Sequence, residues 1–182
     1  EENKILEILS KRYTDVVITE INKREDLDEL LKRKPDLVFS GVKYFNFNKK
    51  KIWLNDCLEL YDIPYIASNR AALDNESDKD RAKKLILKAK IKTADFFVTN
   101  PGEHHSETSI PISFPLFVKP VRGGDSRGID SNSVVYNFAS FKKKILEIKH
   151  KFNLSSLVET YLPGKEYSVG ILQDSINGTL RA

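Results

Sequence analysis

Sulfur is nearly absent from this chain of 182 residues, which has no methionine and a single cysteine, Cys57. One cysteine excludes a disulfide within the chain and a metal site built from several cysteines. Cys57 is expected on the apolar side of a helix, as a small buried side chain rather than a nucleophile. A reducing cytoplasm is therefore the expected location. Because Glu1 is not a native start and Ala182 follows a hairpin signal directly, we expect an N-terminal fragment of a longer protein.

Long apolar runs are also missing, since no segment approaches the ~18 residues of a membrane helix and no signal peptide is visible. Charge of one sign does not dominate either, because 30 basic and 26 acidic residues leave a net charge of +4. Three basic clusters adjoin apolar helical patterns and are interpreted as solvated surfaces: Lys32-Arg33-Lys34, Lys49-Lys50-Lys51 and Lys142-Lys143-Lys144. We therefore expect neither a membrane nor a nucleic acid as partner.

What the first 76 residues contain is an alternation of short apolar strands and amphipathic helical patterns. Strands are expected at residues 15–18, 35–39 and 63–66. Helices are expected around residues 5–9, 26–31 and 52–61, with a polar loop over 40–48. This alternation predicts an α/β fold with a parallel sheet.

The second part of the chain has a different order of elements. A helix capped by Ser77 is expected over 78–90, then a strand at 95–99 and an exposed loop over 100–113. The order then becomes strand, glycine loop, strand, helix, strand, as expected at 114–119, 123–128, 133–136, 138–151 and 156–160. A last strand over 166–173 leads into a hairpin turn signalled by Asn177-Gly178. These elements form one ordered unit of the sequence.

A lysine and a glycine-rich loop stand together at the centre of that unit. Lys119 ends an apolar strand and is followed by Pro120, so its ammonium is held on a rigid element where it can neutralise phosphate oxygens. The loop Gly123-Gly124-Asp125-Ser126-Arg127-Gly128 follows at once, and its glycines allow backbone N–H groups to approach a phosphate. A mobile hairpin is the plainer alternative, but the position of the loop directly after Lys119 favours phosphate contact.

Two glutamates and a second lysine complete the candidate set. Glu159 ends one strand and Glu166 begins the next, and such carboxylates can accept from an amine or from ribose hydroxyls. The alternative is two surface carboxylates beside a Pro-Gly turn. Lys79 opens the helix that leads into this region, although the residues alone do not select it over Lys83 or Lys84. His104 and His105 are adjacent in a loop without further ligands at metal spacing, so no metal role is expected for them.

As an ordered set, these motifs resemble the ATP-grasp superfamily, and within it the D-alanine–D-alanine ligase-like branch. The resemblance implies a Rossmann-like, parallel-sheet pre-ATP-grasp domain followed by an α+β ATP-grasp lobe, with the second lobe truncated before its end. The implied division is a first domain over 1–76, a linking helix, strand and loop over 77–112, the first ATP-grasp lobe over 113–160, and the start of the second lobe over 161–182.

The resemblance also assigns roles within an ATP site. Lys79 and Lys119 match the two lysines that bind ATP phosphates, and the loop from Gly124 to Gly128 matches the one that folds over them. Glu159 matches the adenine-side glutamate, with Thr160 and Leu162 supplying backbone contacts, and Glu166 matches the ribose glutamate. Ser126 is the sole candidate for a direct catalytic part.

The chemistry that the resemblance implies is ADP-forming ligation of a carboxylate to an amine through an acyl phosphate, with ATP and Mg²⁺. Catalysis would come mainly from positioning and charge neutralisation. The expected substrates are small molecules, an amino acid or a short peptide. The family's Mg²⁺ ligands are expected beyond Ala182, so we predict that these 182 residues alone do not turn over. The question of whether the protein forms a homodimer through its first domain stays open.

Two departures from the family pattern leave the substrate open. The stretch over 40–47 lacks the histidine and acids of the corresponding D-alanine ligase segment, and Asp125 stands where the family has the first serine of its loop. Both put D-alanine in doubt without touching nucleotide binding. One alternative is ligation of another amino acid or a peptide. The other is a non-catalytic nucleotide-binding or interaction protein.

Overall fold

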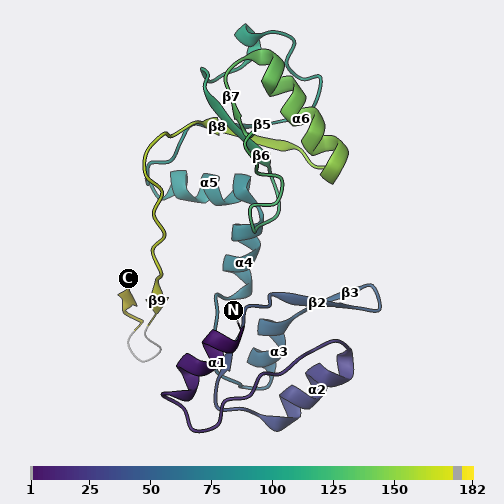
Figure 1. Cartoon of the computed structure of the whole chain (residues 1–182), viewed down its shortest axis with the longest axis vertical. Coiled ribbons are helices and arrows are strands. Elements are labelled where there is room, and N and C mark those ends of the chain that lie inside the picture. Colours follow the sequence, from purple (N-terminus) through teal and green to yellow (C-terminus); the bar gives the residue numbers. More distant parts are fainter. Residues whose placement is uncertain (1, 174–177) are drawn as a thin grey trace. The chain divides into compact units, whose positions relative to one another are not determined.

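The structure is a computed structural model that describes residues 2–173 and 178–182. The chain divides into two compact units, Glu1–Glu76 and Ser77–Ala182, and each is described by itself (Figure 1). Among the helices of the described residues, none combines the length and the apolar character that a membrane crossing requires.

The first unit is built on one leucine-rich core. Helix α1 (Glu2–Ser10) is followed by α2 (Arg24–Arg33), α3 (Leu54–Leu60) and the start of α4 (Arg70–Ser77). Strands β1 (Val38–Phe39) and β4 (Tyr65–Ile66) pair in parallel. The buried core residues come from α2, α3 and the turn after α3: Leu27, Leu30, Leu31, Leu54, Leu58 and Ile63.

A hairpin in this unit corrects two expectations. Residues 40–48 were expected as a loop and Ile52 and Trp53 as part of a helix, whereas β2 (Tyr44–Phe47) and β3 (Lys50–Trp53) form an antiparallel pair. Asn48 and Lys49 both have positive φ, at 49° and 64°, as a two-residue hairpin turn of the primed type requires. The tilted rings of Tyr44 and Trp53, 5.4 Å apart, stabilise the pair across the strands.

The parallel sheet of the first unit is smaller than expected. No strand forms at residues 15–18 in the described structure, and Val17 and Ile18 are exposed. An apolar segment becomes a strand only where a neighbouring strand offers its backbone groups, and none pairs with this one. The mixed helix and strand content is therefore as expected, while the Rossmann-like arrangement stays a prediction.

The second unit contains a four-stranded antiparallel sheet in the order β5-β8-β6-β7 (Figure 1). Its strands are β5 (Phe96–Thr99), β6 (Leu116–Pro120), β7 (Val134–Val135) and β8 (Ser156–Thr160). Helix α5 (Lys79–Lys88) precedes the sheet, and a short 3₁₀ turn, η1 (Glu107–Ser109), lies in the loop after β5.

Helix α6 (Phe138–Phe152) covers one face of this sheet. Asn137 caps it by accepting from the Ser140 N–H at 2.9 Å, and Asn153 ends it in a left-handed conformation. The buried core between helix and sheet consists of apolar residues from β6, β7, β8 and α6: Leu116, Val118, Val135, Phe141, Ile145, Ile148 and Val158. Because side chains alternate along a strand, Phe117 and Lys119 of β6 belong to the other face.

The end of the chain has less strand than expected. Of the segment 166–173, only β9 (Leu172–Gln173) is a strand, paired antiparallel with β10 (Leu180–Arg181). Residues 161–171 have no regular secondary structure, and their apolar side chains are exposed. The turn predicted at 174–178 falls mostly outside the described residues.

Candidate functional site

A carboxylate between two lysines lies on the sheet of the second unit. Glu159 lies on β8 opposite Phe117 of β6 and Phe96 of β5, on the face that α6 does not cover. One carboxylate oxygen accepts from the Lys83 ammonium at 2.5 Å, and the other contacts the Lys119 ammonium. Only 8% of Glu159 is exposed. The three side chains form what we call the Glu159 cluster, with a net charge of +1.

Opposing effects set the ionisation of Glu159. Burial is the largest influence and raises the pKa of this carboxyl, but hydrogen bonds and charge from Lys119 and Lys83 together outweigh it. The pKa of Glu159 is therefore lowered from its ordinary value, and the group is a carboxylate at neutral pH. The excess positive charge of the cluster makes it a suitable neighbour for an anion.

Lys79 is the first residue of α5 and lies about one helical turn before Lys83, on the same face of the helix. Asp78, and not Ser77 as expected, caps the helix by accepting from the Arg81 N–H at 3.2 Å. The Lys79 ammonium donates to the carbonyl of Gly123, and its backbone N–H donates to the Val121 carbonyl at 3.1 Å. The start of α5 is thereby joined to the start of the glycine loop, so Lys79 lies at the loop and Lys83 at the carboxylate.

The glycine loop is a run of tight turns. Gly123, Asp125, Ser126 and Gly128 all have positive φ, at 102°, 55°, 54° and 78°. The Ile129 N–H donates to the Ser126 carbonyl at 3.0 Å. A Cβ atom on Gly128 would lie 2.6 Å from Pro120 Cγ and 2.8 Å from Phe152 Cε2, so only glycine fits there. Gly124 contributes a carbonyl that accepts from the Arg127 N–H at 3.1 Å.

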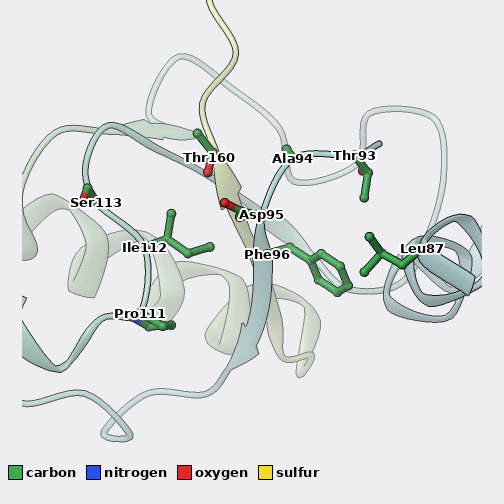
Figure 2. A pocket seen from close by; sticks show the side chains of 9 residues that line it. All are labelled: Leu87, Thr93, Ala94, Asp95, Phe96, Pro111, Ile112, Ser113 and Thr160. Carbon is green, nitrogen blue, oxygen red and sulfur yellow. The ribbon is translucent and has the colours of Figure 1, made fainter. Parts of the chain in front are cut away.

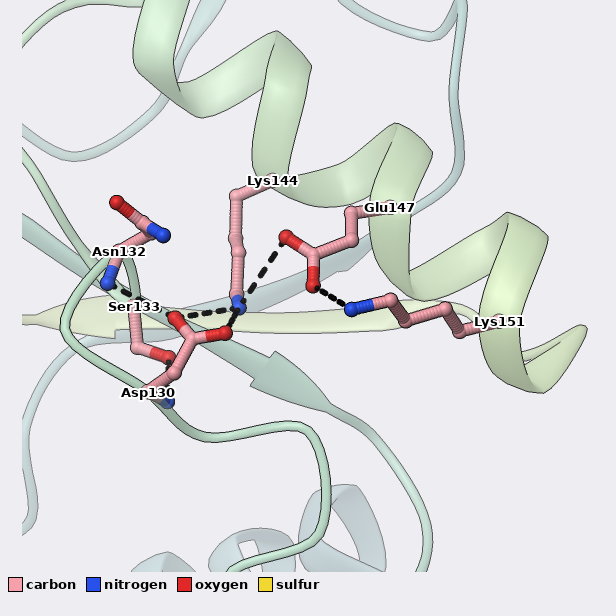
Figure 3. Close-up of polar contacts among 6 residues, drawn as sticks. All are labelled: Asp130, Asn132, Ser133, Lys144, Glu147 and Lys151. Carbon is pink, nitrogen blue, oxygen red and sulfur yellow. Dashed lines mark hydrogen bonds and ion pairs between the residues drawn. The ribbon is translucent and has the colours of Figure 1, made fainter.

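A buried lysine anchors the end of this loop (Figure 3). The Lys144 side chain, 2% exposed, donates to both carboxylate oxygens of Asp130 at 2.9 Å and lies 3.5 Å from Glu147. The hydrogen bond from Lys144 is the main reason that the pKa of Asp130 is lowered. Asp130 also accepts from the Asn132 N–H at 2.8 Å, and its own N–H donates to the Ser133 hydroxyl. These contacts fix the chain just after Gly128.

The remaining predicted residues lie apart from the cluster or contact it only through the backbone. Thr160 follows Glu159 directly, and its N–H donates to the Asp95 carbonyl at 3.0 Å. Leu162 is 66% exposed, and Glu166 is exposed in the stretch without regular structure. Within residues 2–173 and 178–182, Glu166 makes neither an ion pair nor a hydrogen bond with the Glu159 cluster. The structure therefore brings Lys79, Lys119, the glycine loop and Glu159 together, and does not bring Glu166 to them.

A pocket of about 550 Å³ lies beside the first residues of β5. Figure 2 shows Leu87 and Phe96 on one side of it and Pro111 and Ile112 on the other, with Asp95 and Thr160 between them. Thr160 is the one predicted site residue that lines it, and neither Glu159 nor a lysine does. Pocket and cluster are therefore separate features. In the described part of the chain, no group of three or more His, Cys, Asp or Glu residues could hold a metal ion.

Sequence reasoning missed the parts played by Lys83 and Lys144. For Lys83 a signal existed, because residues four apart share one face of a helix and Lys79 was already selected. For Lys144 no signal existed, since it lies in a basic run that was interpreted as a solvated surface. Both side chains prove to be buried and paired with carboxylates.

Comparisons with known proteins bear on this site. A family model described as D-ala D-ala ligase C-terminus matches residues 85–182. A D-alanine–D-alanine ligase of Aquifex aeolicus is 31% identical over 81% of this chain and 50% of its own length. A D-alanine–D-alanine ligase of Clostridium botulinum is 30% identical over 93% of this chain and 53% of its own length. The chain thus spans about half the length of these curated relatives.

Solved structures agree with the fold. The D-alanine–D-alanine ligase from Bacillus anthracis superposes with a TM-score of 0.65 at 20% identity, over 96% of this chain and 62% of that one. The VanG D-Ala:D-Ser ligase from Enterococcus faecalis superposes with a TM-score of 0.52 at 26% identity, over 71% of this chain and 37% of that one. Because the family model covers more than half of the chain, this protein belongs to the D-alanine–D-alanine ligase family of ATP-grasp proteins.

Proposed function

We propose that the protein is an ATP-dependent carboxylate–amine ligase whose phosphate-binding centre is formed by Lys119, Lys79 and the glycine loop. The observation that carries this proposal is the set of contacts that connects the lysines with the loop and with Glu159. Lys79 contacts the carbonyl of Gly123, and Lys119 shares the Glu159 carboxylate with a lysine one turn further along α5. Lysine ammonium groups and loop amides next to each other suit a polyphosphate.

Each predicted residue has a task in this proposal. Lys79 and Lys119 neutralise phosphate oxygens, while the loop from Gly124 to Gly128 covers them, with the Ser126 hydroxyl as a further donor. Glu159 faces the adenine side, where Thr160 and Leu162 offer backbone groups. Glu166 takes the ribose hydroxyls once its exposed segment is closed over the nucleotide. The positive charge of the Glu159 cluster and the strict need for glycine at position 128 support this assignment.

The reaction would form an amide or peptide bond. ATP supplies a phosphoryl group that activates a carboxylate, and an amine then displaces phosphate. The contribution of this chain is to align and neutralise the phosphates, which is where most of the catalysis in phosphoryl transfer lies. Mg²⁺ would assist this step through ligands other than the described residues.

The substrates are the least constrained part of the proposal. Curated relatives are D-alanine–D-alanine ligases and one structural relative is a D-Ala:D-Ser ligase, so an amino acid or short peptide is the substrate class that we propose. Asp125 adds a carboxylate to the loop position where the family has serine, and residues 44–47 of the departing segment 40–47 form the first strand of a hairpin. Both features favour an acceptor other than D-alanine.

The organisation of the whole protein is also proposed from the family. We assign residues 1–76 to the pre-ATP-grasp domain, 77–112 to the link, 113–160 to the first ATP-grasp lobe and 161–182 to the second. A homodimer through the first domain and a cytoplasmic location complete the proposal.

The test is release of ADP by the protein at the full length that its gene encodes. ATP, Mg²⁺ and a panel of D- and L-amino acids and dipeptides are supplied, and ADP is followed by a coupled assay. We expect release that depends on one acceptor, and its loss in Lys119→Met but not in Lys84→Met, because Lys84 is an exposed partner of Asp80. No release with any acceptor, together with no nucleotide binding, would contradict the proposal.

A further inference from the structure

We infer that Lys83 is a positioning residue of the nucleotide site, which holds the Glu159 carboxylate in place so that Lys119 can direct its ammonium to a phosphate. This inference rests on the proposed function. It adds Lys83 to the site and gives separate roles to the two lysines that contact Glu159. Among the described residues, Lys119 is the only other cation on Glu159, so without Lys83 it would have to serve the carboxylate and the phosphate together.

The contacts of Lys83 leave its ammonium little freedom. Lys83 is 8% exposed, the least exposed residue of α5, and its ammonium donates to Glu159 at 2.5 Å and to the Thr93 hydroxyl at 2.8 Å. The same ammonium lies 4.9 Å from the centre of the Phe96 ring. Held by two hydrogen bonds and this ring contact, Lys83 is a fixed support and not a mobile phosphate ligand.

Lys119 is placed differently. Its side chain is 21% exposed, against 10% for the side chain of Lys83, and it extends from the end of β6 just before the glycine loop. An ammonium has three N–H donors, so Lys119 can keep one on Glu159 and turn the others towards a phosphate. A bound phosphate competes with the Glu159 carboxylate for the Lys119 ammonium. Lys83 then becomes the main partner of Glu159.

The charges around Glu159 allow the separate roles of Lys83 and Lys119 to be measured through the protonation of Glu159. The groups that face it are Lys83 from α5 and Lys119 from β6, while its neighbours Phe96 on β5 and Phe117 on β6 carry no charge. A buried carboxylate whose neighbouring cation is drawn to a phosphate is favoured in its protonated form unless a second cation stays beside it. With Lys83 present, Glu159 remains ionised when nucleotide binds. Without Lys83, binding of nucleotide draws a proton onto Glu159.

The experiment is calorimetric titration of ADP into the full-length protein in two buffers with different enthalpies of ionisation. For the wild type we expect an enthalpy that is the same in both buffers at neutral and mildly acidic pH. For Lys83→Met we expect binding weakened by roughly tenfold or more, and an enthalpy that depends on the buffer because a proton is taken up. Lys83→Arg should restore most of the affinity, and Lys84→Met should match the wild type.

The outcomes separate the inference from the function it rests on. If the wild type does not bind ADP, the proposed function fails and the inference with it. If Lys83→Met binds ADP as the wild type does, with no proton uptake, the inference is overturned while the function stands. If Lys83→Met does not fold, carbon-13 NMR of the Glu159 carboxyl in the wild type decides. A carboxyl that stays ionised when ADP is added supports the inference, and one that becomes protonated overturns it.

Discussion

At the scale of single residues, the site depends on the buried carboxylate of Glu159. Its ionised form would be unfavourable without its two lysines. Burial alone would favour protonation of Glu159, and the hydrogen bonds from Lys119 and Lys83 reverse that preference. The converse also holds, because Lys83 has 8% exposure and loses its countercharge if Glu159 becomes neutral. Glu159 therefore matters to stability as well as to the proposed ligand site.

The first prediction concerns Glu159→Gln. At neutral pH this change leaves two ammonium groups without a carboxylate, and we expect a loss of about 2–4 kcal/mol in the free energy of unfolding. Because the pKa of Glu159 is lowered by folding, its stabilisation is present above the unfolded value of about 4.3 and disappears as pH falls through the folded value. Urea unfolding at several pH values should therefore show the gap between variant and wild type shrinking in acid. A gap that is the same at every pH would contradict this.

The second prediction concerns Gly128→Ala in the glycine loop. The φ of 78° and the atoms of Pro120 and Phe152 within 3.0 Å of the missing Cβ leave no room for a methyl group. We expect a loss of about 1–3 kcal/mol in the free energy of unfolding, measured with urea. Gly164→Ala is the control, since nothing lies within 4 Å of its Cβ position and its φ is ordinary, so it should change stability little. Equal effects of the two changes would show that the loop is not held at Gly128.

At the scale of elements, α5 differs from what its sequence pattern suggests. Leu85 and Leu87 are exposed at 43% and 51%, while the charged Lys83 is the one buried residue of the helix. Periodicity of apolar residues predicted the helix correctly, but it could not show that the buried side carries a lysine, because the partner carboxylate lies 76 positions further along the chain. Contacts of that range are decided by the tertiary fold.

The hairpin of β2 and β3 illustrates a second limit of the sequence. Its strands contain Lys50, Lys51 and Asn46 among the aromatic residues, so their polarity favoured a loop. The folded pair adds a contact that the sequence pattern does not show, since the Lys51 ammonium lies 4.0 Å from the centre of the Tyr44 ring. The elements from 114 to 160, by contrast, follow their sequence signals closely, because β6 and β8 contain apolar runs and α6 has an apolar period with Asn137 as its cap.

The third prediction belongs to the link between α6 and the glycine loop. In Lys144→Met the buried ammonium is removed and Asp130, 42% exposed on its side chain, can be hydrated, so we expect a change of less than about 1 kcal/mol in unfolding free energy. In Asp130→Ala the ammonium stays buried with only Glu147 near it, and we expect a loss of about 2–3 kcal/mol. Urea unfolding of both variants measures this asymmetry. The account is wrong if Lys144→Met is the more damaging change.

At the scale of the whole molecule, the second unit carries the candidate site and the family membership. The family model begins at residue 85, within α5, and continues to residue 182. The family was predicted from the sequence on the ordered set of Lys79, Lys119, the glycine loop, Glu159 and Glu166. The substrate could not be predicted in the same way, since Asp125 and the segment over 40–47 depart from the family pattern.

The most direct test of the central claim is nucleotide affinity. ADP and ATP, each with Mg²⁺, are titrated by calorimetry into the full-length protein, into Lys119→Ala and Glu159→Ala, and into Lys84→Ala as the matched control. The account predicts saturable binding by the wild type and by Lys84→Ala, and its loss in the other two variants. Absence of binding by the wild type, or binding that survives in Lys119→Ala and Glu159→Ala, would contradict it.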